Sequence, residues 1–192
     1  ADAAAQYRCG VYLDDTGAGL CACDVSTGKA QATVFTGPDR VRALLNELGR
    51  FAPAEAVMNE AAYFDETLHR TMQERFSCHM EKLSAARFTP EGAEKKVRTQ
   101  FGQEALERLP RDNMTPLLAL GGLLGYLYET QKTDLGHLDQ LTWYRTGQYM
   151  ELDLTARRNL ELTETLRGKE KRGSLLWVLD KTKTAMGARN LR

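Results

Sequence analysis

The sequence predicts an α/β fold with a mixed sheet, and three observations support this prediction. Three short strand-like segments near the N-terminus are separated by tight turns, which is typical of an antiparallel meander. Helical and extended segments then alternate along the chain, as they do in layered α/β structures. A long apolar segment that starts at Thr115 has no polar face, which indicates a buried helix.

The meander is expected to comprise strands at residues 7–13, 19–25 and 29–35. The sequences DDTG and STG separate these strands, and Asp, Ser, Thr and Gly all favour tight turns. A helix is predicted over residues 38–50, because apolar side chains recur there at helical spacing. These side chains are Val41, Leu44, Leu45 and Leu48.

Later elements follow from the same patterns. Residues 53–58 form an apolar run that is expected to be a short buried strand, parallel to the first strand. The remaining predictions are a helix at residues 64–75, a weak strand at 78–83, helices at 91–100 and 103–109, and an extended segment at 138–144.

The buried helix has recognisable signals at its start and along its length. Thr115 and Pro116 stand where an N-cap and a first-turn proline are expected. The helix also carries three glycines, which would let another element approach closely. They are Gly121, Gly122 and Gly125. The helix is too short to span a bilayer, and the sequence contains neither a longer apolar run nor a secretory signal.

Charge is unevenly distributed along the chain. Residues 1–150 hold 16 Lys and Arg against 20 Asp and Glu, and residues 151–192 hold 10 against 6, giving −4 and +4 and a formal net charge of zero. The slightly acidic segment at residues 1–150 is a poor candidate for binding DNA by itself, because contacts with the phosphates dominate such binding. The basic C-terminal part could contact a DNA backbone, but a solvated loop and helix face explains it more simply.

Four cysteines fit no disulfide framework in a chain of this length. They are Cys9, Cys21, Cys23 and Cys78. If the first hairpin is centred near Thr16, Cys9 lies opposite Cys23, and Cys21 points to the same face as Cys23. A zinc site built from these thiols and His79 would lack the usual ligand spacing, so we expect reduced, buried thiols and no metal. Reduced thiols suit the cytoplasm.

A metal-dependent nuclease is the sharpest enzymatic alternative, since carboxylates occur near the first strands. The candidates are Asp14, Asp15, Asp24 and Glu60. The three aspartates fall at turns, where Asp bonds its own backbone, and Glu60 is expected to start a loop. The three histidines have no productive partner, since neighbouring Cys78 and His79 on a strand would point to opposite faces. We therefore predict no catalytic residue, and we expect Tyr126, Tyr128, Trp143, Tyr144 and Tyr149 to be core residues and not base-stacking platforms.

Residues 150–192 predict a helix, a basic loop, a short apolar helix, a turn and the start of a third helix. Asp153 stands at the N-cap of the first helix, and Trp177 belongs to the short helix, which is stable only if it is packed. Asp180 favours the turn, and Gly187 leaves the third helix without bulk near its start. Because Arg192 falls inside that helix, we expect the chain to be a piece of a longer protein.

These motifs carry a family resemblance. The sequences ARRNLELTETL and GSLLWVLDKTKTAMGARNLR are similar to the start of the core, or lever, domain of the MutS family of DNA mismatch repair proteins. Ala188 departs from the glycine or serine that is frequent there. The phrases DVSTG, QFG and PLLALGGLLGYL, in this order, resemble the connector domain of the same family. The resemblance implies a ribonuclease-H-like connector at residues 1–148 and the beginning of a helical lever at residues 149–192.

The resemblance also implies a function. The connector would relay conformational change between the mismatch-binding and ATPase domains and would offer a surface to the partner protein MutL. Lys95 and Lys96, on the exposed face of the helix at residues 91–100, match the region that contacts MutL, while Asp153, Trp177, Asp180 and Gly187 would shape the hinge and lever.

Other activities would reside elsewhere in the full-length protein. Mismatched duplex DNA, ATP and Mg²⁺ would be bound only there, since no G-x-x-x-x-G-K-[ST] loop occurs in this sequence. We expect this chain to carry no cofactor and to be no enzyme, and its place to be the bacterial cytoplasm, in association with the nucleoid. A nuclease and a free-standing interaction domain remain the alternatives.

Overall fold

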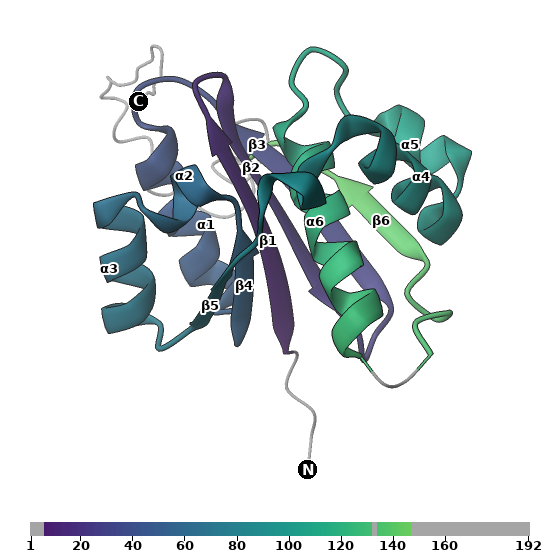
Figure 1. Cartoon of the computed structure of the whole chain (residues 1–192), viewed down its shortest axis with the longest axis horizontal. Helices are drawn as coiled ribbons and strands as arrows, with labels where there is room; N and C mark the ends of the chain where they lie inside the picture. The colour runs from purple at the N-terminus through teal and green to yellow at the C-terminus, as the bar shows by residue number, and fades with distance from the viewer. Residues whose placement is uncertain (1–5, 132–133, 147–192) are drawn as a thin grey trace, which may run out of the picture. The chain divides into compact units, whose positions relative to one another are not determined.

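Six strands form one mixed sheet in the order β5-β4-β1-β2-β3-β6 (Figure 1). The structure is a computed structural model that describes residues 6–131 and 134–146. The strands are β1 (Tyr7–Asp14), β2 (Gly17–Asp24), β3 (Lys29–Phe35), β4 (Glu55–Met58), β5 (His79–Lys82) and β6 (Gln140–Trp143). The helices are α1 (Arg40–Phe51), α2 (Glu60–Tyr63), α3 (Glu66–Arg75), η1 (Ala85–Phe88, a 3₁₀ turn), α4 (Pro90–Phe101), α5 (Gln103–Arg108) and α6 (Thr115–Thr130).

The pairing of the strands confirms the predicted mixed sheet. Strands β1, β2 and β3 pair antiparallel, while β4 runs parallel to β1 and β5 runs parallel to β4. This is the predicted arrangement of an antiparallel meander with added parallel strands. The sequence predicts residues 138–144 only as extended, and the structure shows that β6 adds to the sheet parallel to β3.

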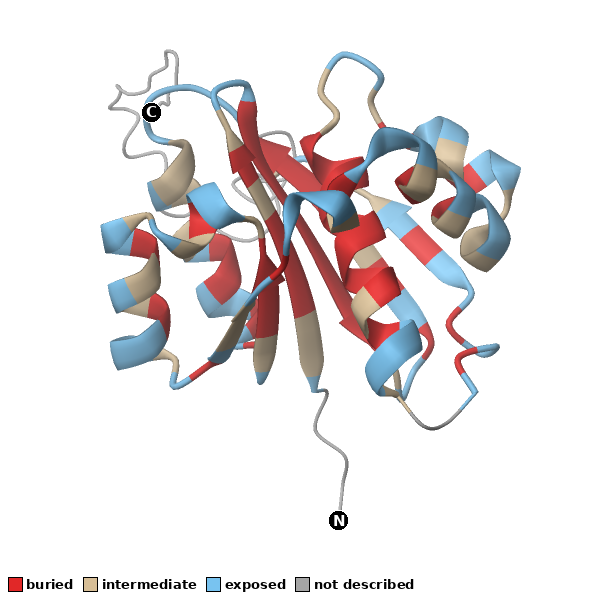
Figure 2. Cartoon of the chain, viewed as in Figure 1, coloured by how far each residue is buried: buried red, intermediate tan, exposed pale blue. Residues whose placement is uncertain are grey.

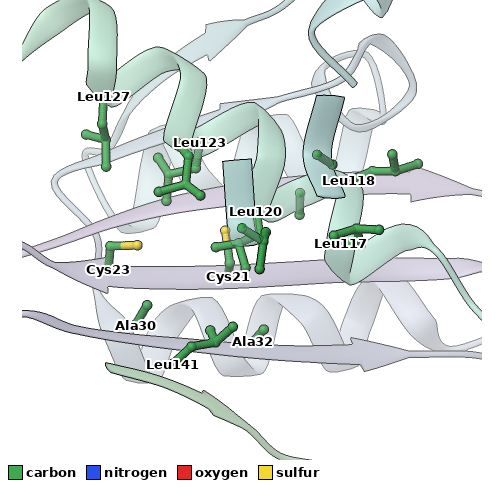
Figure 3. Packing of buried hydrophobic residues seen from close by; sticks show 14 of the residues in the cluster. Cys21, Cys23, Ala30, Ala32, Leu117, Leu118, Leu120, Leu123, Leu127 and Leu141 are labelled. Carbon is green, nitrogen blue, oxygen red and sulfur yellow. The ribbon is translucent and has the colours of Figure 1, made fainter. Parts of the chain in front are cut away.

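Two hydrophobic cores lie on opposite faces of the sheet. Helix α6 covers one face, where its leucines pack on small residues of β2 and β3, among them Cys21, Cys23, Ala30 and Ala32 (Figure 3). Helices α1 and α3 cover the other face, where Leu44, Leu48, Leu68 and Met72 are fully buried. Figure 2 shows that burial is concentrated in the central strands and in α6, as the absence of a polar face on that helix predicts.

The first hairpin differs from the prediction by one residue. Asp14 pairs with Gly17 across a two-residue turn, so Cys9 lies opposite Ala22 and not opposite Cys23. Because side chains alternate along a strand, a shift of one residue reverses the face to which each side chain points. Cys9 therefore belongs to the core under α1, whereas Cys21 and Cys23 belong to the core under α6.

Helix starts account for three further differences. Glu60 begins α2 and is not in a loop, and α3 begins only after Asp65, whose Oδ1 accepts a hydrogen bond of 2.9 Å from the backbone N–H of Leu68. Thr115 is a residue of α6 and Met114 is its N-cap, while the side chain of Asn113, one residue earlier, accepts a hydrogen bond of 3.0 Å from the Thr115 nitrogen. Side-chain acceptors from residues preceding a helix satisfy the free N–H groups of its first turn.

The described part of the chain contains no helix with the length and apolarity needed to cross a membrane. The first compact unit of the chain ends at Tyr144. The predicted hinge and lever residues, Asp153, Trp177, Asp180 and Gly187, lie outside the described residues, and so does the predicted boundary at residue 148.

Candidate partner-binding surface

Helix α4 is held firmly against α6 by contacts that only glycine permits. Ala93 and Val97 form the buried side of α4. A methyl group on Gly121 of α6 would lie 2.5 Å from the Ala93 Cβ, and one on Gly122 would lie 2.3 Å from the ring of Phe88 in η1. The prediction that the glycines of α6 let another element approach closely is therefore confirmed, and the approaching elements are α4 and η1.

The two lysines predicted to contact a partner differ in their surroundings. Lys95 is exposed, whereas Lys96 is only half exposed. The stem of Lys96 runs beside α6, since a methyl group on Gly125 would lie 3.2 Å from its Cε. Long lysine stems commonly cover apolar surface in this way while the ammonium group stays in water. Lys95 is thus the more exposed of the two lysines.

Gln100 connects α4 to two other parts of the structure. Its Nε2 donates hydrogen bonds to the backbone oxygens of Leu135 and Leu138, at 2.9 and 2.7 Å, and its Oε1 accepts one from the hydroxyl of Tyr128 at 2.9 Å. These partners lie 28 to 38 residues away in the sequence, so no local pattern predicts them. Gln100 therefore holds together α4, α6 and the segment that leads to β6.

Tyr128 is an exception to the expectation that the aromatic residues are core. It is 43% exposed at the edge of a surface hollow that Thr99, Gln100 and Gln131 also line. Tyr126, Trp143 and Tyr144 pack partly buried against the cores, and Tyr149 lies outside the described residues. The Tyr126 hydroxyl donates to the carboxylate of Glu55, and this hydrogen bond raises the pKa of Tyr126 to about 12.

The carboxylates proposed for a nuclease site do not converge. Asp14 and Asp24 stand at opposite ends of the β1–β2 hairpin, since Asp24 pairs with Tyr7. Tyr7 and Asp14 are seven residue steps apart along β1, which corresponds to about 23 Å at the usual rise per residue. The Asp14 Oδ1 accepts hydrogen bonds from Thr16, and that of Asp24 accepts from Ser26, as turn chemistry predicts.

Asp15 and Glu60 are exposed, at the first turn and at the start of α2. Across residues 6–131 and 134–146, no three His, Cys, Asp or Glu side chains are grouped so that they could hold a metal ion.

The cysteines are unsuited to nucleophilic chemistry. All four are free and buried. Burial raises the pKa of Cys23 to about 12 and that of Cys78 to about 11, and it also raises those of Cys9 and Cys21. A thiol is a nucleophile only as the thiolate, so these groups are inert near neutral pH.

The partners that the structure shows for the three histidines are backbone oxygens or a carboxylate, and none is a cysteine thiol. His69 bonds the Tyr63 carbonyl, His137 bonds the Val25 carbonyl, and exposed His79 lies 3.4 Å from Glu81.

Comparison with known proteins gives matches over most of the chain. A family model described as MutS domain II matches residues 4–139, and one described as MutS domain III matches residues 155–192. The chain is 39% identical over 186 residues to the DNA mismatch repair protein MutS of Acetivibrio thermocellus, covering 97% of this chain and 21% of that protein. It is also 39% identical to those of Lachnoclostridium phytofermentans and Clostridium novyi, covering 97% of this chain and 20% of each.

The chain thus spans about a fifth of the length of the curated relatives it matches. Among solved structures, T. thermophilus RuvC in complex with a Holliday junction substrate matches with a TM-score of 0.46 and 18% identity, over 66% of this chain and 96% of that one. A similarity of that size supports no conclusion about this chain.

Proposed function

The chain belongs to the MutS family of DNA mismatch repair proteins, and from this we propose that it is a connector module within a longer mismatch recognition protein. In that protein it would relay conformational change between a mismatch-binding domain and an ATPase domain. The observation that carries the proposal is the order of the two family matches, domain II followed by domain III in one chain. Mismatched DNA, ATP and Mg²⁺ would be bound by the other domains, in the bacterial cytoplasm.

A relay must transmit displacement without deforming, and the contacts of α4 are suited to that. The close contact of Gly121 with Ala93 and the three hydrogen bonds of Gln100 join α4 to α6 and to the segment that leads to β6. Packed interiors yield little to small displacements, so a push on α4 would reach these elements largely intact. This argument supports rigid transmission through the α6 side of the sheet.

We also propose that the exposed side of α4 is the surface offered to MutL, with Lys95 as its main contact and Lys96 on its flank. Because α4 is already ordered, binding there would require little loss of conformational freedom. Charged groups at the rim of an interface chiefly set orientation and association rate, so an acidic patch on the partner would complement these lysines.

Charge reversal in the full-length protein tests this surface. We expect Lys95→Glu together with Lys96→Glu to weaken recruitment of MutL by the ATP-bound protein roughly tenfold or more. The matched control is Lys29→Glu with Lys82→Glu, which makes the same change of net charge at exposed lysines of β3 and β5. Equal recruitment by both double variants would refute the assignment of this surface. The single variant Lys95→Glu is measured as well, because it leaves the stem of Lys96 in place beside α6. Weaker recruitment in this variant therefore cannot result from altered packing of Lys96.

A further inference from the structure

Strand β6 buries few of its own side chains and therefore gains little stability from burial. It has four residues, of which Leu141 alone is buried, and among the described residues β3 is the only strand that pairs with it. Short edge strands with one neighbour are among the least stable parts of a sheet. Its position must therefore depend on contacts made by the residues around it, and one such contact is the hydrogen bond of 3.1 Å from Arg108 Nη2 to the Leu141 oxygen.

Tyr144, the residue that follows β6, makes hydrogen bonds with both its backbone and its side chain. The backbone N–H of Tyr144 donates to the Ala32 oxygen at 3.1 Å, which extends the pairing with β3 by one step. Its hydroxyl donates to the carboxylate of Glu47 on α1, and Arg50 Nη2 lies 3.5 Å from the same hydroxyl. Tyr144 is thus held through both its backbone and its side chain.

Glu47 and Arg50, which both contact the Tyr144 hydroxyl, form an ion pair with two hydrogen bonds. Glu47 is only 8% exposed, and its Oε2 accepts from Arg50 Nη2 at 2.6 Å and from Nε at 3.1 Å. The Arg50 guanidinium also lies 4.4 Å from the ring centroid of Phe51 and 5.9 Å from that of Tyr144. A buried carboxylate is costly unless it is paired, so the removal of any one member disturbs the other two.

Burial, followed by the hydrogen bond to Glu47, raises the pKa of Tyr144, so its hydroxyl stays protonated and remains a donor at physiological pH. The hydrogen bond to Glu47 likewise raises the pKa of Arg50. The Tyr144 hydroxyl and the Arg50 guanidinium therefore both remain hydrogen-bond donors to Glu47 at physiological pH.

We propose that Glu47, Arg50 and Tyr144 form a lock that anchors the end of the first compact unit to α1 at the point where the chain leaves the sheet. Tyr144 is the last residue of the first compact unit, and the segment matched by the second family model follows it. The lock acts on the α1 face of the sheet and does not depend on the surface of α4 proposed above.

The lock predicts a local effect that can be measured by hydrogen exchange of individual amides in the 192-residue chain. We expect Tyr144→Phe, which keeps the ring but removes the hydroxyl, to accelerate exchange of the Tyr144 amide roughly tenfold. Amides of Val11 and Leu20 at the centre of the sheet should be unaffected. Tyr126→Phe is the matched control, because it removes a similar tyrosine–glutamate hydrogen bond from α6 and should leave the Tyr144 amide unchanged.

Three results would overturn the proposal. These are an unchanged Tyr144 amide in Tyr144→Phe, the same acceleration in Tyr126→Phe, and a uniform acceleration across the sheet that reflects only lower global stability. A double-mutant cycle with Glu47→Gln gives a further check, since residues of one network are not additive. The double variant should exchange about as fast as the faster single variant, whereas multiplied effects would contradict a shared lock.

Discussion

Gly19 of β2 and Thr115 of α6 meet backbone to backbone. A methyl group on Gly19 would lie 2.2 Å from the carbonyl carbon of Thr115 and 2.3 Å from its oxygen. The buried start of α6 can therefore reach the sheet only where β2 has no side chain. Neither partner can yield, because both contacting groups are main chain in regular elements.

Substitution of Gly19 is accordingly expected to be severe. Gly19→Ala should lower the free energy of unfolding by about 3 kcal/mol, at the upper end of overpacking effects. Urea denaturation followed by circular dichroism would measure it. Gly136→Ala is the control, since the added methyl group would meet only the side chain of exposed Asp134 at 3.3 Å. Similar losses in the two variants would contradict the close approach.

The glycines of α6 differ among themselves in a testable way. Gly121→Ala should lower the free energy of unfolding by roughly 2 kcal/mol, because the methyl group would meet the Cβ and Cα of Ala93 and push α4 away. Gly125→Ala should change it by less than about 1 kcal/mol, since the Lys96 stem can move and alanine favours a helix. Thermal unfolding of both variants would measure the two losses. A larger loss in Gly125→Ala than in Gly121→Ala would show that α4 does not pack on α6 as described.

The burial of α6 could be predicted from the sequence, but its neighbours could not. The lack of a polar face is a local property that any window along the chain reveals. That Gly121 faces Ala93 and Gly122 faces Phe88 depends on how a separate helix crosses α6, which no periodicity encodes. The same reason hides Gln100 and Tyr144, whose partners lie far away along the chain.

The hairpin register shows a different limit. The turn sequence DDTG is recognisable, but a hairpin whose pairing is shifted by one residue would use the same turn residues. The actual turn is set by Asp14, whose Oδ1 accepts hydrogen bonds from Thr16 and Gly17. That single step decides which core receives Cys9, so a small local ambiguity changes a long-range assignment.

The side chain of Asn113 should contribute measurably to stability. Its Oδ1 accepts from the nitrogen and hydroxyl of Thr115, and its Nδ2 donates to the Thr16 oxygen at 2.9 Å. We expect Asn113→Ala to lower the free energy of unfolding by about 1–2 kcal/mol, because the nitrogen of Thr115 and the oxygen of Thr16 each lose a hydrogen-bond partner. Asn113→Asp keeps the acceptor at a helix N-terminus, so a chemical denaturation series should find it milder. An equal loss in both variants would point to the contact with Thr16 instead.

Divalent metal is expected to leave the hairpin ends undisturbed. The amides of Thr16 and Ser26 donate to Asp14 and Asp24, so their NMR signals report on both carboxylates. Because about 23 Å of strand separates the two ends, one ion cannot bridge them. In a Mg²⁺ titration, with NaCl at matched ionic strength as control, neither signal should move beyond the control. Joint shifts of both signals with one saturation curve would revive the nuclease alternative.

The buried thiols should make the protein sensitive to alkali. The pKa of Cys23 is about 12 in the folded protein, raised by burial from its ordinary value of 9.0. Below pH 9.0 the thiol is protonated in both states and its contribution is complete. Above pH 9.0 the unfolded chain releases the proton first, so the free energy of unfolding falls by about 1.4 kcal/mol per pH unit for such a thiol until the folded pKa is reached.

Cys23→Ala should make the measured fall shallower by about that amount, in guanidinium titrations under reducing conditions. Val57→Ala, a truncation in the same core without a titrating group, should lower stability equally at every pH. A slope in Cys23→Ala that matches the parent protein would mean that this thiol ionises in the folded state as readily as in the unfolded one.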